Sequence, residues 1–269
     1  MRIPIALMIA SVCAMLVAAA VPLAGGERAE EETPVFPTTV FEDRLDVDPY
    51  PVTEMDEREL CAGFCPDERQ REAMERMADG IWRWKTADGA SPWWFCGEPH
   101  DGDVALGLSK MVVLAIWEAA YEAERVVGVP VNPWGIAGTA ANESSFDLCA
   151  FGLYPRLEAY ERGVLPRNRR TISHTRKAVL RAINDPGLDK AFRAYDLGML
   201  QTLDMYYDGP REDLLGWDGF RWQVQHMAQR AAYRKTDRPW MYWPGHRSEA
   251  YDRRVTRYAR RFGATEDEI

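Results

Sequence analysis

Two short stretches, Ala140-Ala-Asn-Glu-Ser-Ser-Phe-Asp147 and Tyr195-Asp-Leu-Gly-Met-Leu-Gln201, decide the fold that this chain is expected to adopt. The first sets an acidic residue, Glu143, directly before two serines and an aromatic residue. The second brings an acidic residue, a glycine and a glutamine close together. Each stretch is too short to be specific alone, so the interpretation depends on their order and on the character of the remaining chain.

The N-terminal residues 1–26 are typical of a secretory signal. Arg2 supplies a positive start, the run from Ile3 to Leu23 contains no charge, and the alanines and glycines near its end offer cleavage sites. The run is also close to the length that spans a bilayer, so an uncleaved N-terminal anchor is the alternative. In both cases the rest of the protein is expected to be exported, to the periplasm or the extracellular space.

The remaining chain divides into three parts. Residues 27–50 are acidic and rich in proline, which predicts a flexible tether. Residues 51–102 are expected to form an N-terminal helical extension, and residues 103–263 the main domain. With 46% hydrophobic residues and 10 tryptophans, the chain can bury a substantial core. Its formal net charge of −9 argues against nucleic acid as a partner, and no cofactor or metal is expected.

Hydrophobic periodicity predicts a mainly α fold. Apolar residues recur at three- and four-residue spacing, which predicts helices over residues 66–84, 173–184, 219–235 and 248–262. A further helix over residues 103–127 is apolar around much of its circumference, and such helices usually lie buried in the middle of a domain. No segment alternates as a half-buried strand should.

Asn132 and Pro133 mark the start of the helix that leads to the first stretch. Asparagine is a favoured N-cap, and proline is a favoured first helical residue. The helix is expected to run through Ile136 and Ala140 and to end near Glu143. Glu143 then shares a face with apolar residues at the negative end of the helix dipole, and both effects favour an uncharged carboxylic acid. The alternative is a glutamate that only caps the helix end.

Both stretches resemble segments of lysozyme-like peptidoglycan-cleaving enzymes. Glu143-Ser-Ser-Phe146 resembles the Glu-Ser-x-Phe segment that carries their catalytic acid. The second stretch is similar to the Gly-Leu-Met-Gln segment of soluble lytic transglycosylases and equally to the Asp-x-Gly-x-Leu-Gln segment of animal lysozymes. The resemblance covers about residues 104–262. It implies a lysozyme-like transglycosylase (SLT) helical domain that cleaves the β-1,4 bond between N-acetylmuramic acid and N-acetylglucosamine in peptidoglycan glycan strands, with Glu143 as general acid and base.

The same resemblance places Ser145, Gly198 and Gln201 along the sugar cleft as substrate-binding residues. Glycine would let the backbone approach a sugar closely, and the glutamine amide can donate and accept hydrogen bonds to hydroxyl or N-acetyl groups. Without a ligand role, Gln201 would be a helix-start residue.

Asp196 separates two mechanisms. Animal lysozymes carry a second carboxylate at the matching position, where it stabilises or attacks the oxocarbenium ion. Lytic transglycosylases generally lack it and use the substrate's own N-acetyl group and 6-hydroxyl, which gives a 1,6-anhydro product. Because the segment between Glu143 and Asp196 is far longer than in animal lysozymes, the transglycosylase is preferred. A hydrolytic muramidase that uses both carboxylates is the alternative, and an aspartate that only caps a turn is the third interpretation.

Three aromatic residues are further candidates for substrate contact. The transglycosylase segment Ala-Tyr-Asn-Ala-Gly has a partial counterpart that ends at Tyr233 and lacks the asparagine and glycine, so a core tyrosine is the stronger interpretation there. Trp240 and Trp243 are expected in a loop because prolines flank them. Tryptophan faces stack on the apolar faces of sugar rings, although most tryptophans of a domain this size belong to its core.

Four cysteines remain after the signal: Cys61, Cys65, Cys96 and Cys149. An even number in an exported protein predicts two disulfides, for which three connectivities exist. Cys149 alone lies within the region of the resemblance, so any bond that it makes ties the extension to the main domain. A zinc site that includes histidines is the alternative, although the spacings match no common zinc pattern.

Residues 168–181 form a basic segment in an otherwise acidic chain. The segment could attract carboxylates of peptide stems or other anionic wall polymers, but a solvated helix face is the default interpretation. A non-catalytic glycan-binding or envelope structural protein with the same cleft is the rival of both enzymes. The sequence does not indicate an oligomeric state.

Overall fold

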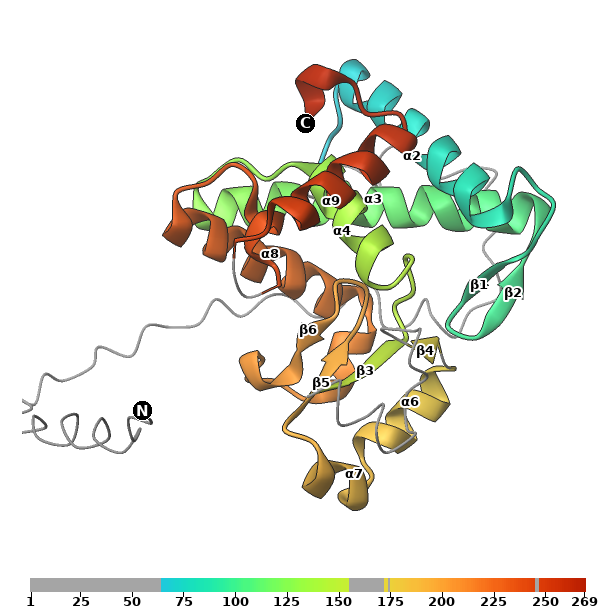
Figure 1. Ribbon diagram of the computed structural model, residues 1–269. Helices are drawn as coiled ribbons and strands as arrows, with labels where there is room; N and C mark the ends of the chain where they lie inside the picture. The colour runs from blue at the N-terminus through green and yellow to red at the C-terminus, as the bar shows by residue number, and fades with distance from the viewer. Residues whose placement is uncertain (1–63, 155–171, 174, 245–246) are drawn as a thin grey trace, which may run out of the picture. The chain divides into compact units, whose positions relative to one another are not determined.

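The computed structural model of the protein describes residues 64–154, 172–173, 175–244 and 247–269 (Figure 1). The predicted signal, the predicted tether and Cys61 lie outside the described residues. Within the described residues the chain is mainly helical, as the hydrophobic periodicity predicts.

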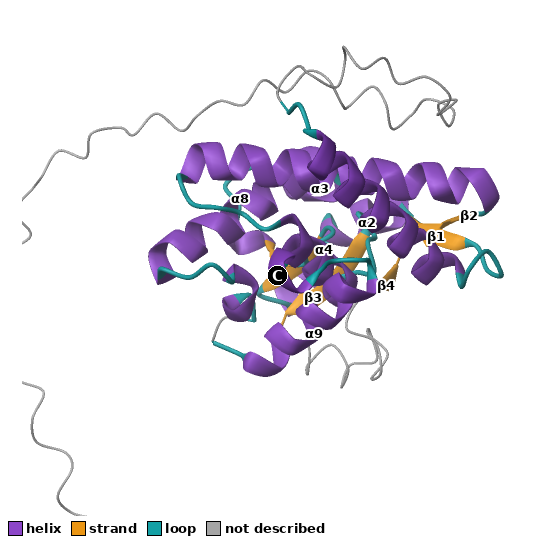
Figure 2. Cartoon of the chain, turned by 90° about the horizontal axis from the view of Figure 1, so that it is seen from above, coloured by secondary structure: helices purple, strands orange, loops and turns teal. Residues whose placement is uncertain are grey.

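Helix α3 (Gly102–Val127) is the central helix. It packs against α2 (Glu68–Thr86), α4 (Pro133–Glu143) and α8 (Trp217–Arg234), and α8 runs beside it (Figure 1, Figure 2). By length and composition α3 could also cross a membrane, but half of its most apolar window (50%) is buried inside the protein. α3 is central, as its apolar pattern predicts, but it is only partly buried, because Met111 and Tyr121 are 43% exposed.

Local sequence signals set the ends of these helices. Asp67 caps α2, because its side chain accepts from the backbone N–H of Gln70 at 2.8 Å while the Gln70 side chain accepts from Asp67 N at 2.9 Å. α3 ends at Gly128, which adopts the left-handed conformation that glycine tolerates (φ 74°). α4 starts as predicted, because Asn132 Oδ1 accepts from the backbone N–H of Trp134 at 2.9 Å.

Helix α9 (Glu249–Arg261) packs closely against α4 because two glycines of α4 lack side chains. A Cβ atom at Gly138 would collide with the backbone of Val255 on α9. A Cβ atom at Gly135 would collide with the ring of Trp240, which precedes α9 in the chain. This close approach brings side chains of α9 to the C-terminal end of α4.

Short strands form two antiparallel sheets, although no segment of the sequence alternates as a half-buried strand should. β1 (Trp93–Phe95) and β2 (Glu98–His100) form a hairpin. The second sheet has the order β4-β3-β5-β6 and contains β4 (Ile172–Ser173), β3 (Ala150–Tyr154), β5 (Ala194–Leu197) and β6 (Thr202–Leu203). Its strands are only 2 to 5 residues long and β5 is buried along its whole length, so no alternation exists for periodicity to detect.

The helix predicted over residues 173–184 begins later than expected. Ser173 pairs in β4, and Thr175 caps α6 (Arg176–Ile183) by accepting from the backbone N–H of Ala178 at 3.2 Å. The basic side chains at the start of α6 are exposed, as a solvated helix face requires. The remaining short helices are α7 (Pro186–Ala191), η2 (Asp204–Tyr206), η3 (Arg211–Leu215), η4 (Pro239–Tyr242) and η5 (Glu266–Glu268).

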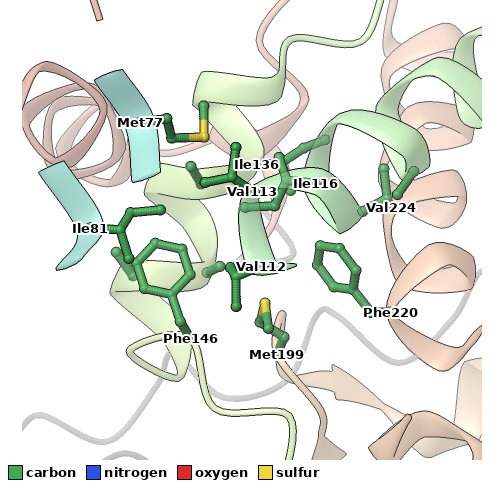
Figure 3. Close-up of a cluster of buried hydrophobic side chains, with 14 of the residues drawn as sticks. Met77, Ile81, Val112, Val113, Ile116, Ile136, Phe146, Met199, Phe220 and Val224 are labelled. Atoms are coloured by element: carbon green, nitrogen blue, oxygen red, sulfur yellow. The ribbon is translucent and has the colours of Figure 1, made fainter. Parts of the chain in front are cut away.

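Two large clusters of buried side chains form most of the core, and a third, small cluster joins Trp240 to Tyr251 and Val255 of α9. The larger cluster combines residues of α2, β1, α3, α4, α8 and α9, and Figure 3 shows its central side chains. α2 contributes Met77 and Ile81, so the segment before residue 103 shares this core with the main domain. The smaller cluster lies against the four-stranded sheet and includes residues of α6 and η3.

A disulfide joins Cys96, in the turn of the β1–β2 hairpin, to Cys149, directly before β3. It ties residues 51–102 to residues 103–263, as the cysteine pattern predicts, and it withdraws both thiols from any zinc site. Asp147 supports the same connection, because its Oδ1 accepts from the N–H groups of Cys96 at 3.1 Å and Cys149 at 2.9 Å. Cys65 is exposed, and the second disulfide stays a prediction because Cys61 lies outside the described residues.

Candidate active site

The two stretches meet where the end of α4 contacts the turn between β5 and β6. Ser144, directly after α4, donates through Oγ to the carbonyl oxygen of Met199 at 2.7 Å. Met199 lies in the turn that also contains Gly198 and Gln201. The side chains of Phe146 and Met199 both enter the larger core cluster (Figure 3). The two stretches therefore form one continuous region.

The chain reverses sharply after Glu143. Ser145 (φ 57°) and Phe146 (φ 63°) both adopt left-handed backbone conformations, which residues with side chains rarely adopt. The reversal buries Phe146 and leaves Ser145 exposed. The Ser145 carbonyl oxygen accepts from Lys85 Nζ at 2.9 Å, so its backbone is engaged by the protein itself.

Glu143 is the last residue of α4, and only 8% of its surface is exposed. Its Oε1 accepts a hydrogen bond from the Tyr251 hydroxyl at 2.6 Å and another from Asn142 Nδ2 at 3.0 Å. A carboxyl group with two donors on one oxygen has a fixed orientation.

Tyr251 reaches Glu143 from α9, and sequence analysis did not assign it to the site. Burial, followed by the charge and the hydrogen bond of Glu143, raises the pKa of Tyr251 well above its ordinary value. The hydroxyl therefore keeps its proton and acts as a donor. The periodicity of residues 248–262 predicts that Tyr251 is buried, but it carries no signal for the partner of the hydroxyl.

Arg254 fixes the second donor. Its Nε donates to Asn142 Oδ1 at 3.2 Å, and its guanidinium lies 5.3 Å from the centre of the Tyr251 ring. Because a guanidinium only donates, the oxygen of Asn142 must face Arg254, and its nitrogen must then face Glu143. No local pattern in the sequence indicates this arrangement.

Gln201 and Asp196 converge above Gly152 of β3. Gln201 Nε2 donates to the carbonyl oxygens of Ala150 (2.9 Å) and Gly198 (3.0 Å). Among the described residues, its buried Oε1 finds no hydrogen-bond partner. A Cβ atom at Gly152 would lie 3.3 Å from this Oε1 and 3.4 Å from Asp196 Oδ2, so both oxygens occupy the space that the glycine leaves.

The contacts of Gly198 give it a packing role. It has a φ of 75°, and a Cβ atom there would collide with the carbonyl oxygen of Leu214 and lie 2.7 Å from Gln223 Nε2. Gln223 is fully buried on α8, donates to Leu197 O at 2.7 Å and accepts from Leu200 N at 3.0 Å. Packing against η3 and α8 therefore explains this glycine without the predicted approach to a sugar.

The three aromatic candidates have different environments. Trp240 is 1% exposed, and its Nε1 donates to Asp252 Oδ1 at 2.8 Å, so it belongs to the core rather than to a sugar platform. Tyr233 is 84% exposed on α8, so the interpretation as a core tyrosine is wrong. Trp243 is half-buried, and its Nε1 donates to Leu200 O at 2.8 Å, which places it beside the second stretch.

Lys85 brings the N-terminal extension to the loop after Glu143. Its ammonium group lies 5.6 Å and 5.4 Å from the ring centres of Trp84 and Trp93. Burial lowers the pKa of Lys85 to about 8, against the opposing effect of the Asp147 charge. The loop is therefore held by a cation that ionises less readily than an exposed lysine.

No protein family, no curated protein and no solved structure matches this chain. The chemistry of the site is therefore derived from its own residues. The site combines a buried carboxyl group of fixed orientation, a buried amide oxygen that has no partner among the described residues, and a second buried carboxyl group. Together they can transfer a proton and accept hydrogen bonds from a polar, uncharged ligand.

Proposed function

We propose that this protein cleaves the glycan strands of peptidoglycan as a lytic transglycosylase. The hydrogen bond between Ser144 and Met199 carries the proposal, because it joins the buried acid of the first stretch to the glutamine turn of the second. If the resemblance of the two stretches were accidental, they would not be expected to contact each other in the folded chain. The position of Glu143 at its helix end, among apolar neighbours, is what a general acid needs.

The first step is protonation of the leaving group. Glu143, protonated on Oε2, gives this proton to the glycosidic oxygen while the bond from that oxygen to the sugar C1 breaks. The carbonyl oxygen of the neighbouring N-acetyl group donates its electron pair to C1 and compensates the developing positive charge. The donors Tyr251 and Asn142 stabilise the carboxylate that remains on Glu143.

The second step returns the proton to the enzyme. The Glu143 carboxylate removes the proton of the sugar's 6-hydroxyl, and that oxygen attacks C1 and displaces the N-acetyl oxygen. The product is a 1,6-anhydro sugar, and Glu143 is protonated again. No water enters the product.

Gln201 is the proposed contact for the N-acetyl group or a hydroxyl group. Its amide is held in one orientation by Ala150 and Gly198, and its Oε1 has no partner among the described residues. An N–H or O–H donor of the sugar would satisfy this oxygen. Trp243, which is anchored on Leu200, lies beside the same turn.

A hydrolytic muramidase is the second candidate, and the position of Asp196 favours it. Asp196 is buried on β5 and its Oδ2 lies with Gln201 Oε1 above Gly152. In this mechanism Asp196 would stabilise or attack the sugar C1, and water would complete the reaction. The substitution Asp196→Asn separates the two mechanisms. A transglycosylase keeps substantial activity and its anhydro products, whereas a retaining muramidase loses most of its activity.

Mass analysis of the products from purified peptidoglycan tests the proposal. Anhydro ends support the transglycosylase, and reducing ends support the muramidase. Complete absence of products, from a protein that carries its disulfide and binds peptidoglycan, would overturn both enzymes in favour of a glycan-binding protein.

A further inference from the structure

A row of polar and aromatic side chains follows one flank of α8. Trp222, His226, Arg230 and Arg234 are spaced by four residues, so they lie one above another on the helix. The opposite flank, with Phe220 among others, is buried against α3. The row therefore lies on the side of α8 that faces away from the larger core cluster.

Aromatic rings stack along the lower part of this row. The rings of Trp222 and His226 are 5.1 Å apart with an angle of 11° between their planes. Tyr206 of η2 stacks on His226 from a centroid distance of 5.9 Å at 20°. The edge of Trp243 meets the same imidazole at 6.2 Å. The Tyr206 side chain is 53% exposed, so the end of the stack is open to solvent.

Two arginines continue the row. Arg230 lies 5.9 Å from the centre of the Trp243 ring and donates to the carbonyl oxygen of Tyr242 at 3.1 Å. Arg234 lies 5.3 Å from the centre of the Tyr242 ring. Within the described part of the chain, neither guanidinium has an acidic partner.

The protonation states of this row favour an anionic ligand near the arginines. Burial lowers the pKa of Arg230, Tyr206 acts in the opposite direction, and the charge of Arg234 lowers the pKa again. The pKa of His226 is lowered by burial and by Arg230, so the imidazole is uncharged near neutral pH. The two arginines therefore supply the positive charge, and they repel each other until an anion lies between them.

The row continues directly from the candidate active site. Trp243 donates to the carbonyl oxygen of Leu200, the residue before Gln201. Tyr206 lies in η2, which follows Gln201 and β6 in the chain. A polymer that reaches Gln201 would therefore meet the rings first and the arginines after them.

We infer that Tyr206, Trp222, His226, Arg230, Arg234 and Trp243, the α8 platform, bind a carboxylate-bearing portion of the glycan strand beyond the cleaved bond. Sugar rings pack their apolar faces against aromatic side chains, and guanidinium groups bind carboxylates through paired hydrogen bonds. Nucleic acid also offers rings and negative charge, but a net charge of −9 disfavours it. The inference rests on the proposed function, because it identifies the polymer as peptidoglycan.

Co-sedimentation with insoluble purified peptidoglycan tests the α8 platform. The full chain with Glu143→Gln serves as the parent, so that binding is measured without cleavage. Adding Arg230→Gln and Arg234→Gln should weaken binding about tenfold or more, because the charge-assisted contacts to carboxylates are lost. Adding Arg69→Gln and Arg71→Gln instead, which removes two exposed arginines of α2, should leave binding unchanged.

Peptidoglycan with its carboxyl groups converted to amides provides the second comparison. The parent should bind the amidated peptidoglycan as weakly as the double arginine variant binds native peptidoglycan. The double arginine variant should bind the amidated and the native material with nearly equal affinity. Tyr206→Ser removes an exposed ring without changing the charge, and it should weaken binding to both materials. Circular dichroism confirms that each variant is folded.

The outcomes separate the α8 platform from the proposed function. Unchanged binding of the double arginine variant, together with cleavage of native peptidoglycan by the wild type, would overturn the platform alone. Arginine-dependent binding with no cleavage by the wild type would overturn the proposed enzyme and retain the platform as a glycan-binding surface. An equal loss of binding in the Arg69 and Arg71 control would show that the effect depends only on net charge, and it would overturn the α8 platform.

Discussion

The two oxygens of Glu143 have different tasks. Oε1 accepts from Tyr251 and Asn142, and these contacts hold the carboxyl group in place before any substrate binds. In the proposed mechanism, Oε2 is then the oxygen that exchanges a proton with the sugar. Donors supplied by the protein need no rearrangement when negative charge develops on the carboxylate, and this is the principal electrostatic advantage of such a site.

Glu143→Gln should leave a folded protein that has lost nearly all glycan cleavage. The amide keeps the size of the side chain but has no acidic proton, and general acid assistance is typically worth ~10²–10⁴-fold. Release of soluble fragments from peptidoglycan measures the loss. Glu249→Gln, an exposed position at the start of α9, is the matched control and should cleave normally. Cleavage by the Glu143 variant within a factor of a few of wild type would reject the assignment.

Arg254→Met should lower kcat and leave KM nearly unchanged. Without the guanidinium, Asn142 can turn its oxygen toward Glu143, which removes one donor and adds a repulsive contact. Arg253→Met, the exposed neighbour, should change neither quantity. An unaltered kcat in the Arg254 variant would show that Asn142 is oriented by other contacts.

Helix α2 takes part in the site through Lys85, and this has a consequence for stability. Its pKa is lowered from 10.5 to about 8 by burial. Between these two values the unfolded chain binds a proton at Lys85 that the folded chain does not bind. The free energy of unfolding should therefore rise with pH across this window.

Lys85→Met should remove that rise. Urea denaturation near pH 8 and near pH 9.5 would compare the wild type with the variant, and the slope of stability against pH should be smaller in the variant. Tyr195 and Tyr207, with pKa values raised to about 12, lower stability mainly above their ordinary value of 10, beyond the two pH values compared. Equal slopes in the two proteins would contradict the burial of the ammonium group.

The hairpin β1–β2 is held to the main domain by the disulfide between Cys96 and Cys149. Replacing both cysteines by serine should lower the free energy of unfolding by ~2–4 kcal/mol, because the closed loop no longer restricts the unfolded chain. Urea denaturation of the wild type with and without reductant gives an independent value. Non-reducing peptide mapping should recover the bonded pair, and two free thiols at these positions would refute the bond.

Much of the helical framework could be predicted from local signals in the sequence. Asn132 and Pro133 specify the start of α4, and the apolar circumference of residues 103–127 specifies the central position of α3. The four-stranded sheet could not be predicted, because strands such as β6 are too short and too buried to show a period. The late start of α6 has the same cause, since Ser173 pairs with Ala150 across the sheet.

The candidate site was only partly predictable for a different reason. Glu143 and Gln201 could be predicted as site residues because their residue types and their place in the two stretches indicate a chemical role. Tyr251 and Arg254 lie on a helix whose period indicates burial but not hydrogen-bond partners. Trp240 lies in η4 and Trp243 directly after it, and only the packing of α4 reveals that Trp240 fills the space beside Gly135. Partners that come from distant elements depend on tertiary packing, which local pattern does not encode.

The shared core of α2 and α3 limits how this protein can be divided. A polypeptide shortened to begin at residue 103 would expose the apolar surface on which Met77 and Ile81 now pack. It would also lack Lys85 beneath the loop after Glu143 and leave Cys149 without its partner. Residues 104–262 therefore cannot be separated from α2 and the β1–β2 hairpin without loss of core contacts and of the disulfide. A chimaeric protein that contains these residues would have to include α2 and the hairpin as well. Recombinant production with the disulfide formed requires a compartment in which thiols oxidise.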